Sequence, residues 1–270
     1  MEAREVVAAP GRARTVRERG AFTLVCEGVT VRYGRVVALA DVGFEASAGE
    51  VVGVVGPNGA GKTTLFRALV GLVPLERGAV LLDGEPVRGA RSRVVYVPQR
   101  EAVDWSFPIS VLDVVLMGVT ARRGWLHRAT ARDREAAMAA LEEVDMAAYA
   151  DFAIGDLSGG QQQRVFLARA LCQGGDVLAL DEPFAALDVA ATRAVEEILR
   201  RLVDRGRLVL LSTHDLSQAA QLCDRVLLLN RRPVAYGPPT DVLRPETLRA
   251  AYGHRVLVVG EGRVAVSDLH

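Results

Sequence analysis

Hydrophobic and polar residues alternate over residues 22–44, and the alternation is interrupted at Tyr33-Gly34. A period of two predicts a pair of antiparallel strands joined by a turn. The pattern changes at Glu50-Val51-Val52-Gly53-Val54-Val55, an apolar run typical of a strand buried on both faces. A glycine-rich loop at 56–61 and a helix over about 62–73 follow it. This order predicts a strand–loop–helix unit.

The rest of the chain predicts an α/β core with a helical insert. Short strands are expected within 78–98, and a helical pattern runs over about 108–157, clearest at Thr130–Val144. Strands and helices then alternate, so each helix can act as the crossover of a parallel sheet. Beyond Pro238 a short helix and a hairpin are expected. The later strands are predicted at 176–180, 208–212 and 225–229, and the hairpin strands at 255–259 and 263–266.

Composition narrows the class of protein. Half of the 270 residues are hydrophobic, which is enough for a sizeable core, and the formal net charge of zero argues against a nucleic-acid partner. Residues 1–20 carry five arginines without periodicity and predict a mostly disordered tail; contact of this basic tail with anionic lipid is the alternative. The cysteines Cys26, Cys172 and Cys223 lack metal-type spacing and predict buried free thiols. We see no apolar run of the ~20 residues that a membrane helix needs.

One motif points to a phosphate ligand. Of the 33 basic residues only Lys62 is lysine, and it lies in Gly56-Pro57-Asn58-Gly59-Ala60-Gly61-Lys62-Thr63, followed by Thr64. This segment matches the P-loop, G-x-x-x-x-G-K-[ST], in its required strand–loop–helix context. Backbone N–H groups of the loop would face the β- and γ-phosphates, Lys62 would bridge phosphate oxygens, and Thr63 would ligate Mg²⁺. The structural alternative is a glycine turn before a helix.

A second candidate site follows the strand at 176–180, which ends in Asp181 and Glu182. Ligands gather at the carboxyl ends of parallel strands, so these carboxylates are expected beside the P-loop. Asp181 would lie near Mg²⁺ and Glu182 could polarise an attacking water. By itself the pair could equally be an acidic helix cap.

A third candidate is the segment Leu157-Ser158-Gly159-Gly160-Gln161 before a helical stretch. Ser158 can cap the helix, and the two glycines leave its first N–H groups accessible to an anion. An ordinary capped helix start is the structural alternative. One nucleotide cannot easily use two such helix ends from one chain.

Taken in order, these motifs resemble the ATP-binding subunits of ABC transporters over roughly residues 22–240. The resemblance implies a P-loop NTPase (RecA-like) α/β core with an antiparallel β subdomain and a helical insert. It also implies further roles: Tyr33 stacking on adenine, Gln99 in the catalytic and Mg²⁺-binding set, Asp188 of Ala186-Leu187-Asp188 communicating between sites, and His214 contacting the γ-phosphate.

The same resemblance implies how the chain would work. Two copies would bind head to tail around two ATP, with Ser158-Gly159-Gly160 of one copy closing on the γ-phosphate held by the other. Integral-membrane permease subunits and a metal-binding solute-binding protein would complete the system at the cytoplasmic face of the membrane. The expected division is a tail at 1–20, an ATPase domain at 21–240 with a helical subdomain at about 100–157, and an extension at 241–270. Phe184-Ala185 departs from the family, where a serine or threonine is common.

The cargo is suggested by residues 103–118. Val103-Asp104-Trp105-Ser106-Phe107-Pro108, followed by Asp113-Val114-Val115 and Met117-Gly118, resembles the ATPases of manganese, zinc and iron importers. Trp105 and Phe107 could anchor a helix of the permease, or could simply pack the insert onto the core. His127, His254 and His270 are scattered and form no ligand cluster.

Other functions are open at this point. Among transporters, the second interpretation is an importer of another cargo, such as an iron chelate. A relative acting on DNA or ribosomes would carry long coiled coils or tandem ATPase units, neither of which we find. A non-catalytic regulator is disfavoured because Glu182 and His214 are both present.

Overall fold

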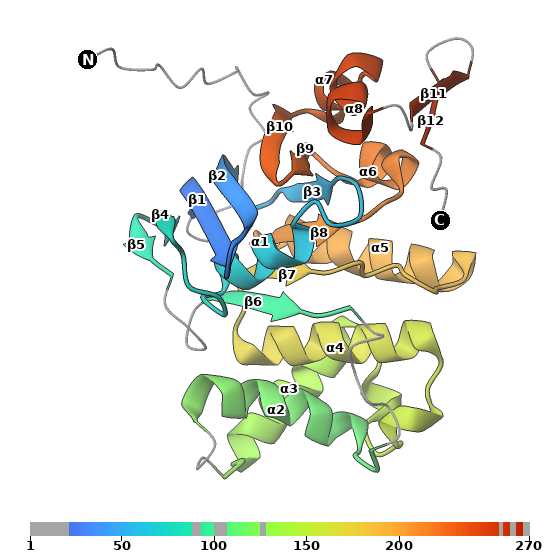
Figure 1. Cartoon of the computed structure of the whole chain (residues 1–270). Coiled ribbons are helices and arrows are strands. Elements are labelled where there is room, and N and C mark those ends of the chain that lie inside the picture. Colours follow the sequence, from blue (N-terminus) through green and yellow to red (C-terminus); the bar gives the residue numbers. More distant parts are fainter. Residues whose placement is uncertain are drawn as a thin grey trace.

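The computed structural model describes residues 22–87, 93–99, 107–124, 128–253, 256–259 and 263–266. The expected tail at 1–20 lies outside these residues. Two β-sheets and a group of helices make up the described part (Figure 1).

The first sheet contains the predicted antiparallel pair. Strands β1 (Thr23–Tyr33) and β2 (Val36–Ser47) pair antiparallel and are joined by a turn at residues 34–35. This confirms the antiparallel pair that the alternation of hydrophobic and polar residues predicts. Strands β4 (Arg77–Leu82) and β5 (Glu85–Pro86) extend it in the order β2-β1-β4-β5. The inward-facing residues of this sheet, Leu24, Val31 and Leu39 among them, are completely buried.

The second sheet has the order β10-β9-β3-β8-β7-β6. Strands β3, β6, β7, β8 and β9 run parallel, as the apolar runs predict, and β10 pairs antiparallel with β9. Strand β10 is not among the predicted strands; most of its residues are half-buried, and it contains Pro233. The bounds are β3 Val51–Val55, β6 Val94–Val97, β7 Val177–Leu180, β8 Leu208–Ser212, β9 Arg225–Asn230 and β10 Arg232–Gly237.

Two hydrophobic cores cover the two faces of the parallel sheet. Helix α1 (Lys62–Leu69) packs between this sheet and the antiparallel one, with Leu65 and Phe66 completely buried. It ends earlier than the expected residue 73, because the chain turns at Gly71 with φ 71°. The opposite face packs against helices α4, α5 (Val189–Asp204) and α6 (Leu216–Leu222).

The expected helical insert contains α2 (Val111–Arg123) and α3 (Ala131–Glu143), with short 3₁₀ turns at Ala147–Tyr149 and Ile154–Asp156. Helix α4 (Gly159–Gln173) begins beyond the expected end of the insert at about residue 157 and shares its hydrophobic core. These helices form the lower part of Figure 1. Thr130 caps α3 in a reciprocal capping box with Asp133, which confirms the predicted start. Helix α2 lies close to α4 at Gly118, where a Cβ atom would be 2.3 Å from the carbonyl oxygen of Arg169.

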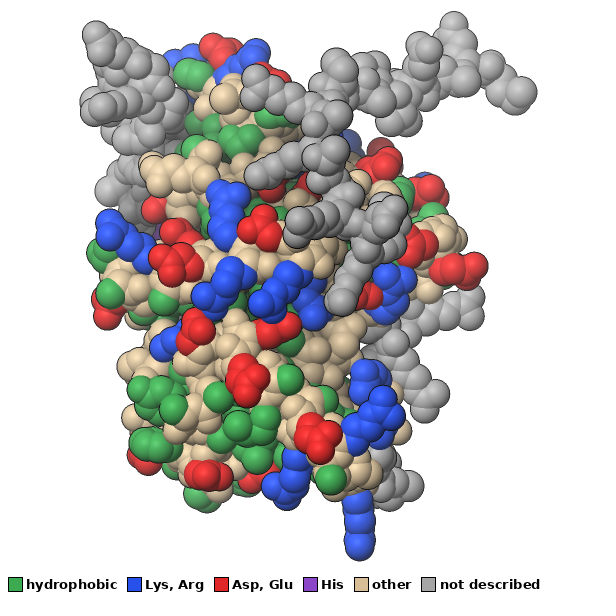
Figure 2. Space-filling view, turned by 180° about the vertical axis from the view of Figure 1, so that it is seen from behind, with side chains coloured by type: hydrophobic (Ala, Val, Ile, Leu, Met, Phe, Trp, Pro, Cys, Tyr) green, Lys and Arg blue, Asp and Glu red, His purple; other side chains and the backbone are tan. Residues whose placement is uncertain are grey.

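The C-terminal part contains α7 (Pro239–Val242), α8 (Pro245–Tyr252) and the predicted antiparallel hairpin of β11 (Val256–Val259) and β12 (Arg263–Val266). All three cysteines are buried and free, as expected. Within the described ranges, we find no helix with both the length and the apolarity to span a membrane. Acidic and basic side chains of the described residues are intermixed over the face shown in Figure 2.

Candidate nucleotide site

The candidate residues gather where four neighbouring parallel strands end. The P-loop follows β3, His214 follows β8, Asp181 follows β7 and Gln99 follows β6. These four strands are consecutive in the sheet, in the order β3-β8-β7-β6. Their carboxyl ends therefore lie along one edge of the sheet, the place where open α/β sheets bind ligands.

The P-loop folds tightly against both sheets. A Cβ atom at Gly56 would lie 2.0 Å from the carbonyl oxygen of Leu229, and one at Gly61 would lie 2.8 Å from that of Ala38. Gly61 also has φ 99° and precedes the first residue of α1, so the loop requires glycine there for both space and conformation. The Lys62 ammonium is nearly buried and donates to the carbonyl oxygen of Gly56 at 2.8 Å.

A cleft of about 330 Å³ opens over this loop. Tyr33 lines it, and 45 % of the surface of this residue is exposed. The cleft is lined by Tyr33, Val36, Val37, Ala38, the loop and helix residues Asn58, Gly59, Ala60, Gly61, Lys62, Thr63 and Thr64, and by Glu182 and Arg231. The predicted P-loop, Tyr33 and Glu182 thus share one cavity.

Asp181 is 4 % exposed and both of its carboxylate oxygens receive hydrogen bonds. Ser212 Oγ donates to Oδ1 at 2.7 Å, and Tyr96 Oη donates to Oδ2 at 3.1 Å. Burial, together with the charge of Asp181, raises the pKa of Tyr96 to about 12, so its phenol stays a donor. Two donors fix the orientation of a carboxylate at the end of β7.

Glu182 has an unusual backbone conformation, with φ 47°. Its N–H donates to Ser212 Oγ at 2.8 Å, and its Oε2 lies 3.8 Å from Nδ1 of His214. A second cavity of about 270 Å³ lies beside this pair, lined among others by Thr192, Thr213 and Gln218. Backbone strain of this kind, held by a hydrogen bond, is typical of residues at functional sites.

The segment Ser158–Gln161 is a true helix start. Ser158 N donates to Gln161 Oε1 at 2.8 Å, and Gln161 N donates to Ser158 Oγ at 3.4 Å, so the predicted cap at Ser158 is present. A Cβ atom at Gly160 would lie 2.6 Å from the Cβ of Ala191 in α5. None of the residues that line the P-loop cleft comes from this segment.

Asp188 caps α5 and accepts a hydrogen bond from Ala191 N at 2.7 Å. Asp188 therefore has a structural role as the cap of α5, and the role expected from the family resemblance stays a prediction. Because Gly160 packs on the same first turn of α5, the Ser158 segment and Asp188 are neighbours in the fold.

Comparison with known proteins decides the family. The family described as ABC transporter matches residues 39–185, more than half of the chain. The chain belongs to the ABC transporter family. This ABC ATPase is 46 % identical to the manganese transport system ATP-binding protein MntB of Bacillus subtilis (strain 168), over 87 % of this chain and 94 % of that protein. It is 45 % identical to the zinc transport system ATP-binding protein TroB of Treponema pallidum (strain Nichols), over 93 % and 94 %.

Solved structures agree on the fold. A nucleotide-free ATP-binding cassette from an ABC transporter superposes with a TM-score of 0.77, at 22 % identity, over 86 % of this chain and all of that one. The cbiO1 protein of Clostridium perfringens, part of the complex cbiONQ, gives 0.70 at 26 % identity, over 84 % and 92 %. The expected fold, an ATPase core with an antiparallel β subdomain and a helical insert, is confirmed, and the chain is an ATP-binding, ATP-hydrolysing protein.

Three residues that contribute to the site of this ABC ATPase were not predicted from the sequence. Tyr96 and Ser212 lie within strands that the sequence predicts, but only the strand order brings them to Asp181, since β7 pairs with β6 on one side and β8 on the other. Arg231 lines the P-loop cleft from the turn between β9 and β10, and its N–H donates to the carbonyl oxygen of Ala60 at 2.8 Å. Had β10 been predicted, the turn between β9 and β10 that carries Arg231 would have been predicted with it.

Some expectations for the ABC ATPase lie outside the described residues. Trp105, His127, His254 and His270 belong to this group, whereas Phe107 is described and is 62 % exposed. Within the described part of the chain, no group of three or more His, Cys, Asp or Glu residues is arranged to hold a metal ion.

Proposed function

We propose that this ABC ATPase powers an importer of a divalent metal ion, manganese, zinc or iron, through a separate permease. The observation that carries the proposal is its likeness to proteins named for manganese and zinc transport, at 45 and 46 % identity over nearly their whole length. The second candidate, an importer of an iron chelate, shares every feature of the nucleotide site and differs only in cargo.

The proposed nucleotide site uses the cleft over the P-loop. Residues 56–64 cradle the phosphates of ATP through backbone N–H groups, Lys62 supplies a charge, and Tyr33 stacks on adenine. The ammonium of Lys62 lies within the loop, where it donates to the carbonyl oxygens of Gly56 and Pro57. Binding of phosphate would exchange these carbonyl partners for phosphate oxygens.

Thr63, Gln99 and Asp181 would hold the Mg²⁺ that accompanies ATP. The donor set suits this ion, because Mg²⁺ prefers oxygen ligands and usually takes one or two from protein, completing its shell with phosphates and water. Asp181 is fixed by two hydrogen bonds, which supports an orienting role for its carboxylate. Bound Mg²⁺ would neutralise charge on the phosphates.

Hydrolysis is assigned to Glu182 and His214. Glu182 lines the P-loop cleft and the adjoining cavity, so its carboxylate can orient a water molecule toward the γ-phosphate. His214 Nδ1 lies 3.8 Å from Glu182 Oε2, close enough to help hold the same water or the phosphate oxygens.

The active unit proposed here is a head-to-tail dimer around two ATP. Ser158, Gly159, Gly160 and Gln161 form an anion-binding helix end that does not line the chain's own P-loop cleft. In a twofold dimer this end would close on the nucleotide held by the other copy, and Asp188, close to it on α5, would connect the two sites.

The remaining partners follow from the family. Integral-membrane permease subunits would dock on the helical insert from the membrane side, placing the chain at the cytoplasmic face, and a metal-binding solute-binding protein would deliver the cargo. Exposed hydrophobic residues on the insert, Phe107 and Met117, suit such docking. We assign residues 21–240 to the ATPase domain, about 100–157 to its helical subdomain, 241–270 to an extension and 1–20 to a tail.

Two measurements test the proposal. Glu182→Gln should block hydrolysis and retain a dimer in saturating MgATP, visible by size-exclusion chromatography with light scattering, whereas the surface change Glu246→Gln should behave as wild type. A monomeric Glu182→Gln protein under these conditions would contradict the dimer.

The cargo is tested in cells that contain the assembled transporter. Lys62→Ala should lower the cellular content of one of manganese, zinc or iron, and Arg232→Ala should not. Unchanged handling of all three metals, with ATP hydrolysis abolished in the purified Lys62→Ala protein, would refute the cargo and leave the ATPase assignment intact.

A further inference from the structure

A hydrogen-bonded side chain on α6 holds the loop that carries His214. Thr213 and Asp215 flank this histidine, and Asp215 N donates to Thr213 Oγ1 at 3.0 Å. The hydroxyl of Thr213 in turn donates to Gln218 Oε1 at 3.2 Å. Gln218 therefore contacts the residue immediately before His214.

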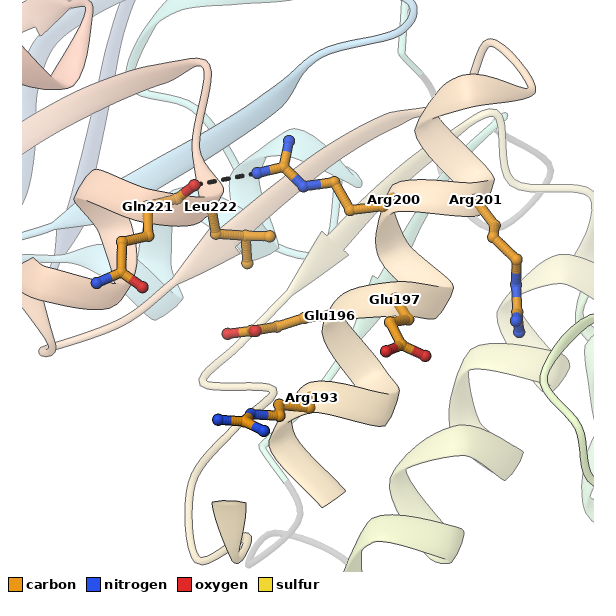
Figure 3. Close-up of a pocket in the computed structure, with 7 residues that line it drawn as sticks. All are labelled: Arg193, Glu196, Glu197, Arg200, Arg201, Gln221 and Leu222. Carbon is orange, nitrogen blue, oxygen red and sulfur yellow. Dashed lines mark hydrogen bonds between the residues drawn. The ribbon is translucent and has the colours of Figure 1, made fainter. Parts of the chain in front are cut away.

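The other end of Gln218 is anchored on a different element. Its Nε2 donates to Glu196 Oε1 at 3.1 Å, and Glu196 belongs to α5. In Figure 3 the side chain of Glu196 projects from α5 toward the side on which α6 lies. A carboxylate only accepts hydrogen bonds, so the amide nitrogen must face Glu196, which leaves the amide oxygen for the hydroxyl of Thr213.

This chain of bonds lies beside the candidate catalytic pair. Gln218, Thr213, His214 and Glu182 all line the same cavity of about 270 Å³. The His214 side chain is 63 % exposed, so its own packing does little to fix its position. Its distance from Glu182 is instead set by the backbone of the loop, which Thr213 and Asp215 hold.

We propose that Gln218 is a positioning residue for ATP hydrolysis, which fastens the His214 loop to α5 by bridging Thr213 and Glu196. The inference rests on the ATPase activity and on the role of His214, and it is independent of the cargo. Loss of the bridge leaves the nucleotide cleft unchanged, because neither Gln218 nor Glu196 lines it.

The test measures kcat and KM for MgATP on the full-length chain. Gln218→Ala should lower kcat about five- to thirtyfold, as expected for one to two lost hydrogen bonds, with KM unchanged within about twofold. Gln221→Ala is the matched control: it lies on the same helix, and the bond from Arg200 reaches its backbone carbonyl, which the change retains (Figure 3).

A swap of the bridge separates positioning from general loss of stability. Gln218→Glu should be as slow as Gln218→Ala, because two carboxylates then face each other across the bridge. Adding Glu196→Gln should restore kcat, since the new amide can donate to the new carboxylate, which still accepts from Thr213. Thermal unfolding of all variants is followed in parallel.

The outcomes are distinct. A Gln218→Ala protein with kcat within twofold of wild type, or a double variant no faster than Gln218→Glu, overturns the positioning role while the ATPase stands. A wild-type chain that binds ATP without hydrolysing it overturns the ATPase function itself.

Discussion

Ser212 is the residue on which the geometry of both acidic side chains depends, and its replacement by alanine is the sharpest test of the site. Its Oγ donates to Asp181 Oδ1 at 2.7 Å and accepts from Glu182 N at 2.8 Å. The residue is completely buried at the end of β8. Ser212→Ala removes both bonds and changes little else, because the two side chains share the Cβ atom and differ only in the hydroxyl group.

The expected cost can be worked out bond by bond. A hydrogen bond to a charged acceptor contributes roughly 1.5–3 kcal/mol, and a buried N–H left without a partner costs roughly 1–3 kcal/mol. Asp181 keeps its bond from Tyr96 and the N–H of Glu182 is only partly buried, so the lower part of each range applies. We expect the free energy of unfolding to fall by about 2–4 kcal/mol.

Urea denaturation followed by circular dichroism measures this loss. Ser217→Ala, at an exposed position on α6, is the control and should change the free energy of unfolding by less than about 0.5 kcal/mol. Because Ser212 also holds Glu182 at φ 47°, kcat for ATP should fall about tenfold or more, the factor that 1.4 kcal/mol in a barrier produces. A Ser212→Ala protein with wild-type stability and wild-type kcat would refute this account.

Other changes probe separate features. Tyr96 has a pKa of about 12 in the folded state, whereas tyrosines of the unfolded chain ionise near pH 10. Between about pH 10 and pH 12 the unfolded chain therefore loses this proton while the folded state keeps it, so the free energy of unfolding falls as pH rises. Tyr96→Phe should therefore lose stability less steeply in denaturation series across that window, and equal slopes would contradict the shifted pKa. Gly118→Ala should destabilise the chain by about 1–3 kcal/mol in urea, because the new Cβ would meet the backbone of α4. Arg231→Ala should raise KM for ATP about fivefold in a steady-state assay while Arg232→Ala does not, since only Arg231 lines the cleft; equal values would remove Arg231 from the site.

The elements of the core could be predicted because their signals are local. Val51–Val55 and Leu208–Leu211 are short apolar runs, and both lie in strands whose residues are all buried. The start of α3 was predictable for the same reason, since Thr130 and Asp133 are three residues apart. The strand β10 was missed because it is half-buried and irregular, so its pairing with β9 decides its structure.

The supporting residues of the site could not be predicted, because strand order brings them together. Tyr96 precedes Asp181 by 85 residues and Ser212 follows it by 31, and nothing in the local pattern links the three. Asp181 itself was predictable since an apolar strand ends in it. The sequence motifs thus identify the residues to which we assign ATP binding and hydrolysis. The residues that orient them are identified only by the pairing of strands in the folded sheet.

Helix α5 connects the two ends of the proposed mechanism. Its first turn is capped by Asp188 and packs against Gly160, in the helix end proposed to reach the ATP of the other copy. Two turns later it carries Glu196, which holds Gln218 and through it the loop of His214. A helix moves largely as a rigid body, so a displacement at Gly160 would be transmitted along α5 to His214 without any change within the sheet. In the proposed dimer each chain would contribute its Ser158 segment to one nucleotide site and its His214 to the other, so closure of one site would adjust the histidine of the second.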